Sequence, residues 1–350
     1  MKYSNVYIES IGYEIAPVVM SSAELEGRLA DLYAALHLAE GQLEALTGII
    51  ERRWWEEGYR LSDGAIAAAG RALEASNVSA QQLGALIYGG VCREHFEPAT
   101  ACRVAAAIGV GPEAAVYDVS NACLGVLNGM VEIANRIEIG QIRAGMVVSC
   151  ETAREINEIV IEQMKSTKSM DFFKNALATL TGGSGAVAVL LTDGSYSASK
   201  GRKLVGGANR TAPQFHGLCR WGIDTNEPRA RHQYHQFTST DSAAVLTHGV
   251  ALGKETWQAF LRRLGWGEDQ VDKVICHQVG KAHRETILKS LGIPESRDFS
   301  TYPYLGNMGT VSLPLTAALA EDRAFLQSGD RVAFLGIGSG LNCLMLGLEW

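Results

Sequence analysis

Three features are scarce or absent in this sequence, and each limits the kinds of protein that it can encode. The 350 residues include only eight prolines, fewer basic than acidic residues, and no apolar run of the roughly 18 residues that a membrane span requires. The formal net charge of −7 argues against a sequence-independent nucleic-acid binder, which needs a basic surface. Glu9 stands where a signal peptide would have its apolar stretch. We therefore expect a cytoplasmic protein without a membrane span.

The cysteines lack the pattern of a metal site or of a disulfide framework. The seven residues are Cys92, Cys102, Cys123, Cys150, Cys219, Cys276 and Cys343. Their number is odd, and no pair has metal-finger spacing, so we predict no metal site and interpret the thiols as reduced. Most of them are expected to be small buried hydrophobes. An apolar fraction of 47% and a charged fraction of 20% are typical of a globular enzyme.

Strand-like and helix-like runs alternate along the chain, which predicts an α/β fold with mostly buried sheets. Strands are expected at 3–16, 86–90, 116–119, 144–149, 186–191, 274–276, 331–336 and 343–348. Helices are expected at 22–36, 39–46, 62–76, 99–108, 124–137, 242–264, 281–291 and 312–327. The segments 165–181 and 206–242 have mixed polarity and are interpreted as insertions that line a substrate site.

The second half of the chain repeats features of the first half. A Gly-Ser-Gly sequence precedes a terminal apolar run in both 182–191 and 336–345, and the runs at 86–91 and 274–279 occupy comparable places. Two such pairs suggest duplication of one α/β unit. The predicted halves are 1–197 and 198–350.

Cys123 is the first candidate for chemistry. It follows the strand-like run Val116–Val119 and precedes a run with apolar residues at helical spacing, which predicts a position at a helix N-terminus. There the positive end of the helix dipole is expected to favour the thiolate. A thiolate is the nucleophile that acyl transfer requires.

Three other residues have a functional and an ordinary interpretation each. His277 ends a strand-like run, where it can transfer protons or hold an oxyanion, or can simply be a core or surface histidine. Asn307 stands between glycines, as an amide donor to an oxyanion or as a turn residue. Glu97 lies in a polar loop, where most glutamates are only solvated. Gly338-Ser339-Gly340 can present backbone N–H groups or can form a plain turn.

The order of these motifs resembles the thiolase superfamily, and most nearly its β-ketoacyl-ACP synthase III-like condensing enzymes. The resemblance rests on Asn-Ala-Cys-Leu-Gly at 121–125, His-Gln at 277–278, Gly-Asn-Met-Gly at 306–309, Gly-Ile-Gly-Ser-Gly at 336–340 and Thr-Gly-Ile-Ile-Glu-Arg at 47–52. It implies a duplicated five-layer αβαβα fold and a homodimer. No cofactor is implied, because CoA or acyl carrier protein (ACP) thioesters are the substrates.

The resemblance also implies roles for the candidate residues. Cys123 would receive the acyl group, while His277 and Asn307 would activate the second substrate and stabilise its enolate. The backbone N–H groups of Cys123 and Ser339 would form the acyl oxyanion hole. The Trp and Arg with which family members clamp CoA are replaced by Gln42 and Leu46, so Lys281 or Arg284 is predicted to bind the carrier instead.

A narrower resemblance points to the head-to-head hydrocarbon (olefin biosynthesis) thiolases. The shared runs are 121–124, 128–130, 150–153, 277–279 and 336–343, together with Glu97-Pro98 in a loop that reaches the partner subunit. In that group the glutamate is thought to be the base for a condensation without decarboxylation. A plain acyl donor must lose a proton, whereas a malonyl donor makes its carbanion by losing CO2.

The leading hypothesis is therefore an acyltransferase that condenses two acyl thioesters to a 3-ketoacyl product without decarboxylation. One alternative is a decarboxylating 3-oxoacyl-ACP synthase III of fatty acid biosynthesis. A second is a thioesterase, or an enzyme that transfers the acyl group to an alcohol or amine. A third is a catalytically silent dimeric binding protein, which slow alkylation of Cys123 at neutral pH would favour.

Overall fold

The computed structural model describes residues 1–196, 201–224 and 235–350. Its strands are β1 (Tyr7–Ile15), β2 (Val18–Ser21), β3 (Glu51–Trp54), β4 (Ala85–Gly89), β5 (Ala115–Val119), β6 (Ala144–Glu151), β7 (Gly185–Thr192), β8 (Arg202–Thr211), β9 (Cys219–Asp224), β10 (His235–Thr240), β11 (Lys273–Cys276), β12 (Arg331–Gly338) and β13 (Asn342–Glu349). Its α-helices are α1 (Ser22–Arg28), α2 (Ala30–Leu36), α3 (Gln42–Thr47), α4 (Leu61–Glu74), α5 (Thr100–Ile108), α6 (Gly125–Glu138), α7 (Arg154–Thr167), α8 (Met170–Ala176), α9 (Ser242–Leu264), α10 (Lys281–Leu291), α11 (Tyr302–Leu305) and α12 (Ser312–Asp322).

A nine-stranded mixed sheet with the order β11-β12-β13-β8-β1-β7-β6-β4-β5 forms the centre of the protein. Reading outward from the central β8–β1 pair, each half begins with two antiparallel pairings and then a parallel one. The halves therefore correspond strand by strand: β1 matches β8, β7 matches β13, β6 matches β12 and β4 matches β11. Both sequence echoes fall on such pairs, so the duplication is confirmed.

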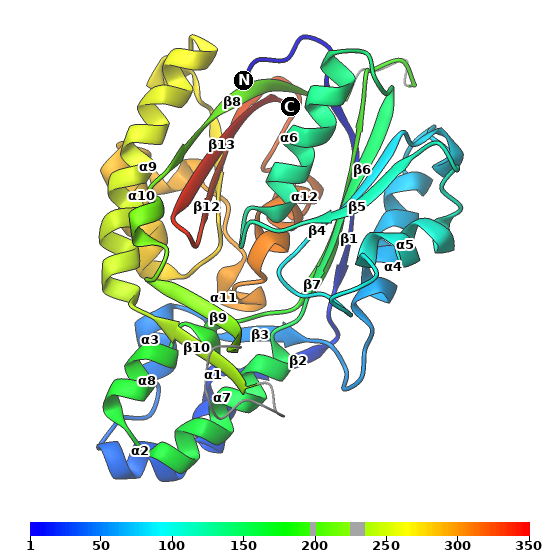
Figure 1. Cartoon of the computed structure of the whole chain (residues 1–350). Coiled ribbons are helices and arrows are strands. Elements are labelled where there is room, and N and C mark those ends of the chain that lie inside the picture. The colour runs from blue at the N-terminus through cyan, green and yellow to red at the C-terminus, as the bar shows by residue number, and fades with distance from the viewer. Residues whose placement is uncertain (197–200, 225–234) are drawn as a thin grey trace.

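The two halves are not separate bodies, because β1 and β8 pair antiparallel through Tyr7↔Lys203 and Ile8↔Arg202. The predicted boundary at 197/198 lies outside the described residues. The continuous sheet curls so that its two halves face each other across α6 and α12 (Figure 1). Strands β4, β6 and β7 pack against an apolar cluster on each face, which explains why they are buried along their whole length.

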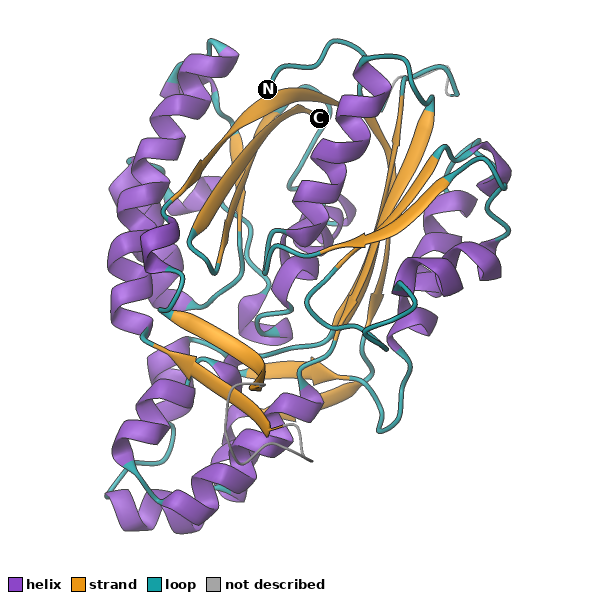
Figure 2. Ribbon diagram, in the orientation of Figure 1, coloured by secondary structure: helices purple, strands orange, loops and turns teal. Residues whose placement is uncertain are grey.

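Five layers follow from this arrangement, as the secondary-structure colouring makes clear (Figure 2). Helices α4 and α5 cover the outer face of the N-terminal half, and α9 and α10 cover the outer face of the C-terminal half. The central core joins α6 and α12 to the inner faces of both halves. The predicted αβαβα fold is confirmed.

A helical cap covers one end of the layers. It consists of α1, α2, α3, α7 and α8 with the antiparallel β2–β3 pair, and it has its own apolar core around Leu25, Leu43, Trp54 and Phe173. The antiparallel β9–β10 ribbon lies between this cap and α9 (Figure 1). The prediction that 206–242 is an insertion is wrong for its first residues, because β8 pairs with β13 inside the central sheet. The apolar pattern of β8 is interrupted by glycines, and this obscured the strand.

Most other predicted elements are confirmed within a few residues, and α9 and α10 match their expected ranges. The expected helix at 22–36 is divided at Leu29, whose φ of −104° and ψ of 15° leave the helical region. The expected helix at 312–327 ends at Asp322, because Ala324 has a left-handed φ of 56°. The segment 154–167, for which no helix was predicted, forms α7.

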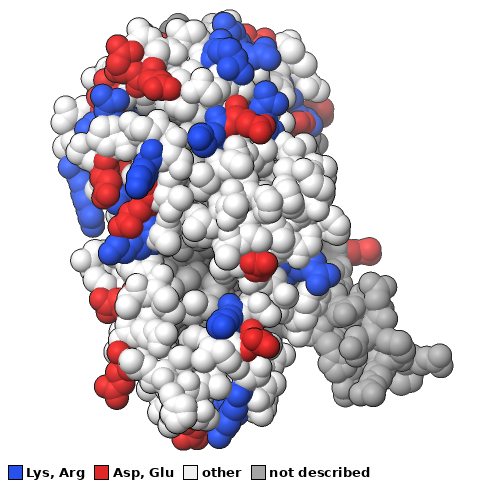
Figure 3. All heavy atoms as spheres, turned by 90° about the vertical axis from the view of Figure 1, so that its left-hand side faces the viewer, with Lys and Arg blue, Asp and Glu red and all other residues white. Residues whose placement is uncertain are grey.

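The outer surface over α9 and α10 carries charges of both signs. Basic and acidic side chains alternate there and do not separate into one large patch of each sign (Figure 3). Within the described residues, no helix is both long and apolar enough to cross a membrane.

Candidate active site

Cys123 lies in the turn between β5 and α6, two residues before the first helical residue. The preceding residue, Ala122, has a left-handed φ of 46°, which is uncommon for a residue with a Cβ. The turn is closed by the N–H of Leu124, which donates to the carbonyl oxygen of Asn121 at 2.9 Å. A strained turn of this kind places the thiol beside the helix start, as predicted from the sequence.

The structure does not favour the thiolate that the sequence predicts at Cys123. Burial, followed by the nearby Cys219 and Glu151, raises the pKa of Cys123 to about 12. Desolvation disfavours the charged form, and here it outweighs the helix dipole. A reaction at this sulfur would therefore require a neighbouring base to accept the thiol proton.

His277 follows β11 directly and is 9% exposed. Its backbone is fixed by hydrogen bonds to Leu335 and Val279. Burial, and to a lesser degree His283, lowers the pKa of His277 to about 4. The ring is therefore neutral at physiological pH, and a neutral imidazole can accept a proton at one nitrogen while donating from the other.

Gln278 explains how the loop that carries His277 is held. Its side-chain oxygen accepts from the backbone N–H groups of Thr301 and Tyr302, and its side-chain nitrogen donates to the carbonyl oxygen of Cys276. The residue is 2% exposed, so its amide is used entirely inside the protein. Gln278 supports the site and does not contact the cavity.

Asn307 lies in the loop between α11 and α12. Its side-chain oxygen accepts from the N–H of Gly309 at 3.0 Å, and its backbone bonds to Thr181 and Gly183. Within the described residues its side-chain nitrogen has no partner, so the two N–H donors remain available to a ligand. Thr310 ties this loop to the nucleophile, because its hydroxyl accepts from the N–H of Val126 at 2.7 Å.

The Gly338-Ser339-Gly340 turn joins β12 to β13 and lies against the turn of Cys123. A Cβ at Gly338 would lie only 3.4 Å from the backbone nitrogen of Cys123. The backbones of the two turns are therefore in close van der Waals proximity. This approach brings the two predicted oxyanion donors, the N–H groups of Cys123 and Ser339, to the same wall.

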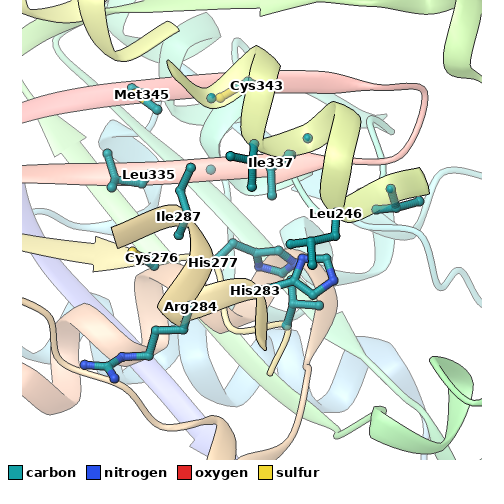
Figure 4. A pocket seen from close by; sticks show the side chains of 16 residues that line it. Leu246, Cys276, His277, His283, Arg284, Ile287, Leu335, Ile337, Cys343 and Met345 are labelled. Atoms are coloured by element: carbon teal, nitrogen blue, oxygen red, sulfur yellow. The ribbon is translucent and has the colours of Figure 1, made fainter. Parts of the chain in front are cut away.

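One cavity of about 120 Å³ collects most of the predicted site. Cys123, His277, Asn307 and Ser339 all line it, although they come from four separate loops. A neighbouring apolar cavity of about 50 Å³ extends between α9, α10 and the β12–β13 hairpin, and it shares His277 and Ile337 with the first. Figure 4 shows the rings of His277 and His283 beside each other at this second cavity.

Glu97 does not line any cavity that Cys123 lines in the same chain. It lies instead on an open groove of about 1,120 Å³ with Phe96, Thr152 and Trp221. Phe96 is 84% exposed. Within the described residues of one subunit, Glu97 and Cys123 therefore line different cavities.

Lys281 and Arg284, the two residues predicted to bind the carrier, differ in the surroundings of their charged groups. Lys281 has an exposed side chain and lines a cavity of about 290 Å³ that also contacts Leu46, His283 and Asn307. Arg284 points away from the cavity of Figure 4, and each of its three nitrogens donates to Asp298 or Glu295. The geometry therefore supports a carrier role for Lys281 only.

Three residues near the site were not predicted. His283 lines the same cavities as His277, Cys219 lines both cavities of Cys123, and the buried Glu151 lines a cavity of about 190 Å³ with Cys123 and Asn307. Glu151 stands in the run Cys150–Ala153 of the sequence resemblance, and its place after a buried strand was a signal that the sequence offered. His283 and Cys219 had no such signal. All seven cysteines are free thiols.

Comparison with known proteins gives consistent results. The family model for the C-terminal part of 3-oxoacyl-[acyl-carrier-protein] synthase III matches residues 261–350. An acyl-CoA:acyl-CoA alkyltransferase of Shewanella oneidensis is 56% identical over the whole of both chains. A β-ketoacyl-[acyl-carrier-protein] synthase III of Streptomyces coelicolor is 28% identical over 92% of both chains. The structure of Xanthomonas campestris OleA with bound lauric acid and lauroyl-CoA has a TM-score of 0.92 and 33% identity, covering 99% of this chain and 100% of that one.

Proposed function

The chain belongs to the β-ketoacyl-ACP synthase III-like condensing enzymes of the thiolase superfamily, and on that premise we propose that it joins two acyl-CoA molecules in a Claisen condensation without decarboxylation. The observation that carries this proposal is the convergence of Cys123, His277 and Asn307 on one cavity. A nucleophile, a neutral imidazole and an amide N–H donor are the groups that thioester condensation requires.

The first half of the reaction transfers an acyl group to Cys123. His277 accepts the thiol proton, and the sulfur attacks the carbonyl carbon of the first acyl-CoA. The N–H groups of Cys123 and Ser339 donate to the oxygen on which negative charge develops. The C–S bond to CoA then breaks, and the leaving thiolate takes the proton back from His277.

The second half forms the new carbon–carbon bond. A base removes an α-proton from the second acyl-CoA, and the resulting enolate oxygen accepts hydrogen bonds from His277 and from the side-chain amide of Asn307. The α-carbon attacks the acyl carbonyl on Cys123, the bond from that carbon to sulfur breaks, and the Cys123 sulfur regains a proton as the base gives up the one it removed. The product is a 3-ketoacyl-CoA that carries the alkyl chain of the second substrate at its α-carbon.

We assign the base to Glu97 of the partner subunit in a homodimer. Three observations support the assignment: Glu97 is outside its own Cys123 cavity, its loop is at the surface, and the adjacent Phe96 is exposed. An apolar residue that is exposed in one subunit and buried by another is typical of an interface. The proposal places this dimer in the cytoplasm, where acyl-CoA is available.

The apolar cavity between α9 and α10 is proposed to hold an alkyl chain. Its wall includes Leu246, Ile287, Leu335, Ile337 and Met345, and it continues from the cavity of Cys123. The exposed Lys281 lies beside a further cavity that reaches Asn307, where its charge can attract the phosphates of CoA.

The decarboxylating alternative predicts a different proton balance. A malonyl donor would release CO2 and would not need Glu97, whereas the proposed reaction exchanges an α-proton before condensation. The identity of 56% to an acyl-CoA:acyl-CoA alkyltransferase, against 28% to a 3-oxoacyl synthase, favours the reaction without decarboxylation.

The proposal is tested by following both half-reactions with acyl-CoA. Mass spectrometry of the intact protein should show an acyl adduct in the wild type and in Cys102→Ala, whose cysteine is exposed, but not in Cys123→Ala. The α-protons of acyl-CoA should exchange with deuterated water in the wild type, and this exchange should be lost in Glu97→Ala. Adduct formation on Cys123→Ala would refute the nucleophile. CO2 release from malonyl donors would support the synthase alternative, and free acid without a ketone would support a thioesterase.

A further inference from the structure

Glu151 is a buried carboxylate that the proposed reaction does not use. It is the last residue of β6 and is 5% exposed. No Lys, Arg or His of the described residues forms an ion pair with it, and burial raises the pKa of Glu151. Burying a carboxylate without a cation is unfavourable, so its position calls for a physical account.

Both oxygens of Glu151 bind the backbone at the base of the loop that carries Glu97. One oxygen accepts from the N–H of Val91 at 2.8 Å, and the other accepts from the N–H of Cys92 at 3.1 Å. These are the second and third residues after β4, and Glu97 follows five residues later. Two bonds to consecutive amides fix the direction in which the loop leaves the sheet.

A second set of contacts fastens the same segment to the end of β6. The hydroxyl of Tyr88 lies 2.9 Å from the carbonyl oxygen of Cys92 and 2.6 Å from that of Cys150. The thiol of Cys92 lies 3.4 Å from the carbonyl oxygen of Thr152. The base of the loop is therefore held from both sides, while its tip at Phe96 and Glu97 is exposed.

The other side of Glu151 faces the cavity of about 190 Å³ described above. Glu151 lines it together with Cys123 and Asn307. The position that a Cβ would take on Gly309 lies 3.5 Å from the Cγ of Glu151, so the Glu151 side chain lies beside the loop that positions Asn307. Glu151 thus lies between the loop of Asn307 and the loop that carries Glu97 at the surface of the same subunit.

We propose that Glu151 is a positioning residue for condensation: it holds the base of the Glu97 loop and so sets the place of Glu97 at the Cys123 of the other subunit. This inference rests on the proposed function. The role assigned to Glu151 is carried by its bonds to the two backbone amides and includes no proton transfer with the substrate. A base misplaced by about 1 Å is expected to lose on the order of 100-fold in rate.

The isosteric variant Glu151→Gln separates the two half-reactions. Its side chain keeps one acceptor but presents an N–H where the other amide donates, so one bond to the loop is lost. Acylation of Cys123 should stay within about threefold of the wild type, because it does not use Glu97. The α-proton exchange and the condensation should fall by about 10- to 100-fold. Tyr88→Phe, which loosens the same loop base, should show the same split.

Glu155→Gln is the matched control. Glu155 lies on the groove of Glu97, and within the described residues its carboxylate accepts a hydrogen bond from the Thr152 hydroxyl alone, so both half-reactions should be retained. An equal loss of acylation and condensation in Glu151→Gln would overturn the inference, as would unchanged condensation. If Glu97→Ala keeps the exchange while Glu151→Gln loses it, Glu151 is itself the base and the positioning role is wrong. A wild type that shows no exchange refutes the proposed function instead.

Mixed dimers give the sharpest test, because each contains one working cysteine and one altered glutamate. When Cys123→Ala and Glu151→Gln are on the same subunit, the working Cys123 is served by a misplaced Glu97, and condensation should fall. When the two changes are on different subunits, the working Cys123 is served by an intact loop, and condensation should be near half that of the wild type. The opposite pattern would show that Glu151 acts within its own subunit.

Discussion

The side-chain amide of Asn342 donates a hydrogen bond of 3.0 Å to the side-chain oxygen of Asn121. Asn121 is two residues before Cys123, and Asn342 follows the Gly338-Ser339-Gly340 turn by two residues. The side-chain nitrogen of Asn121 in turn donates to Asn128 of α6 at 2.8 Å. A pair of amides from the two halves of the chain thus joins the two turns that supply the proposed oxyanion donors.

Removal of this bond should slow acylation of Cys123. We expect Asn342→Ala and Asn121→Ala each to lower the acylation rate by about tenfold, less than the loss of a donor itself, because the N–H groups remain but shift. The double variant should be no slower than either single variant, since residues in one hydrogen bond are coupled, here by about 1.4 kcal/mol, the whole of a tenfold effect. Rapid-quench measurement of acyl-enzyme tests this expectation. Strictly additive losses would show that the two residues act separately.

The low pKa of His277 predicts a specific dependence on pH. Condensation should not lose activity through protonation of His277 until the pH approaches 4. Between pH 6.5 and about 4 the unfolded chain binds a proton at this residue that the folded protein does not bind. The contribution of His277 to the free energy of unfolding should therefore be fully present above pH 6.5. It should decrease as the pH falls, by up to about 3 kcal/mol.

Denaturant titrations at pH 7.5 and pH 4.5 measure this loss. The difference between the two pH values should be smaller in His277→Gln, which has no ring to protonate. His283, whose pKa is also lowered by burial, remains in that variant and accounts for part of the residual dependence. An identical pH dependence in the wild type and in His277→Gln would contradict the assignment.

The high pKa of Cys123 predicts slow alkylation of the free enzyme. At pH 7 iodoacetamide should modify the exposed Cys102 before Cys123, and the rate at Cys123 should still rise with pH above 10. Peptide mapping after timed quenching measures both sites. A fast reaction that is already constant at pH 7 would show a stabilised thiolate. Slow alkylation therefore does not indicate a silent binding protein, and acylation by thioesters is the test that separates the two.

Replacement of Arg284 by alanine should lower the stability of the fold, whereas replacement of Lys281 by alanine should weaken the binding of acyl-CoA. Arg284→Ala leaves the buried carboxylate of Asp298 without its cation and should destabilise the fold by about 3–5 kcal/mol. Lys281→Ala removes only a weak, exposed ion pair, so the melting temperature should be unchanged. We expect Lys281→Ala to raise KM for acyl-CoA with little change in kcat. A normal KM would remove Lys281 from the carrier site.

The sequence could predict much of the fold, because the signals were local and strong. The apolar runs of β4, β6 and β7 predict buried strands directly. The long periodic pattern of α9 predicts a helix with one buried face. The repeated Gly-Ser-Gly before β7 and β13 revealed the duplication. The glycine-interrupted β8 was missed because its place in the sheet depends on pairing with β13, which is more than 100 residues away.

For the site, the sequence by itself determined which chemistry is available: a nucleophilic Cys123, His277 at a strand end and Asn307 in a glycine turn. Only the tertiary structure decided how these groups are tuned. Burial raises the pKa of Cys123 and lowers that of His277, and it reverses the expectation drawn from the helix dipole. Tertiary packing also binds Arg284 to Asp298 while it leaves the side chain of Lys281 exposed. It places Glu151 between two loops. Desolvation and hydrogen bonding depend on residues distant in sequence, so no local pattern could have specified them.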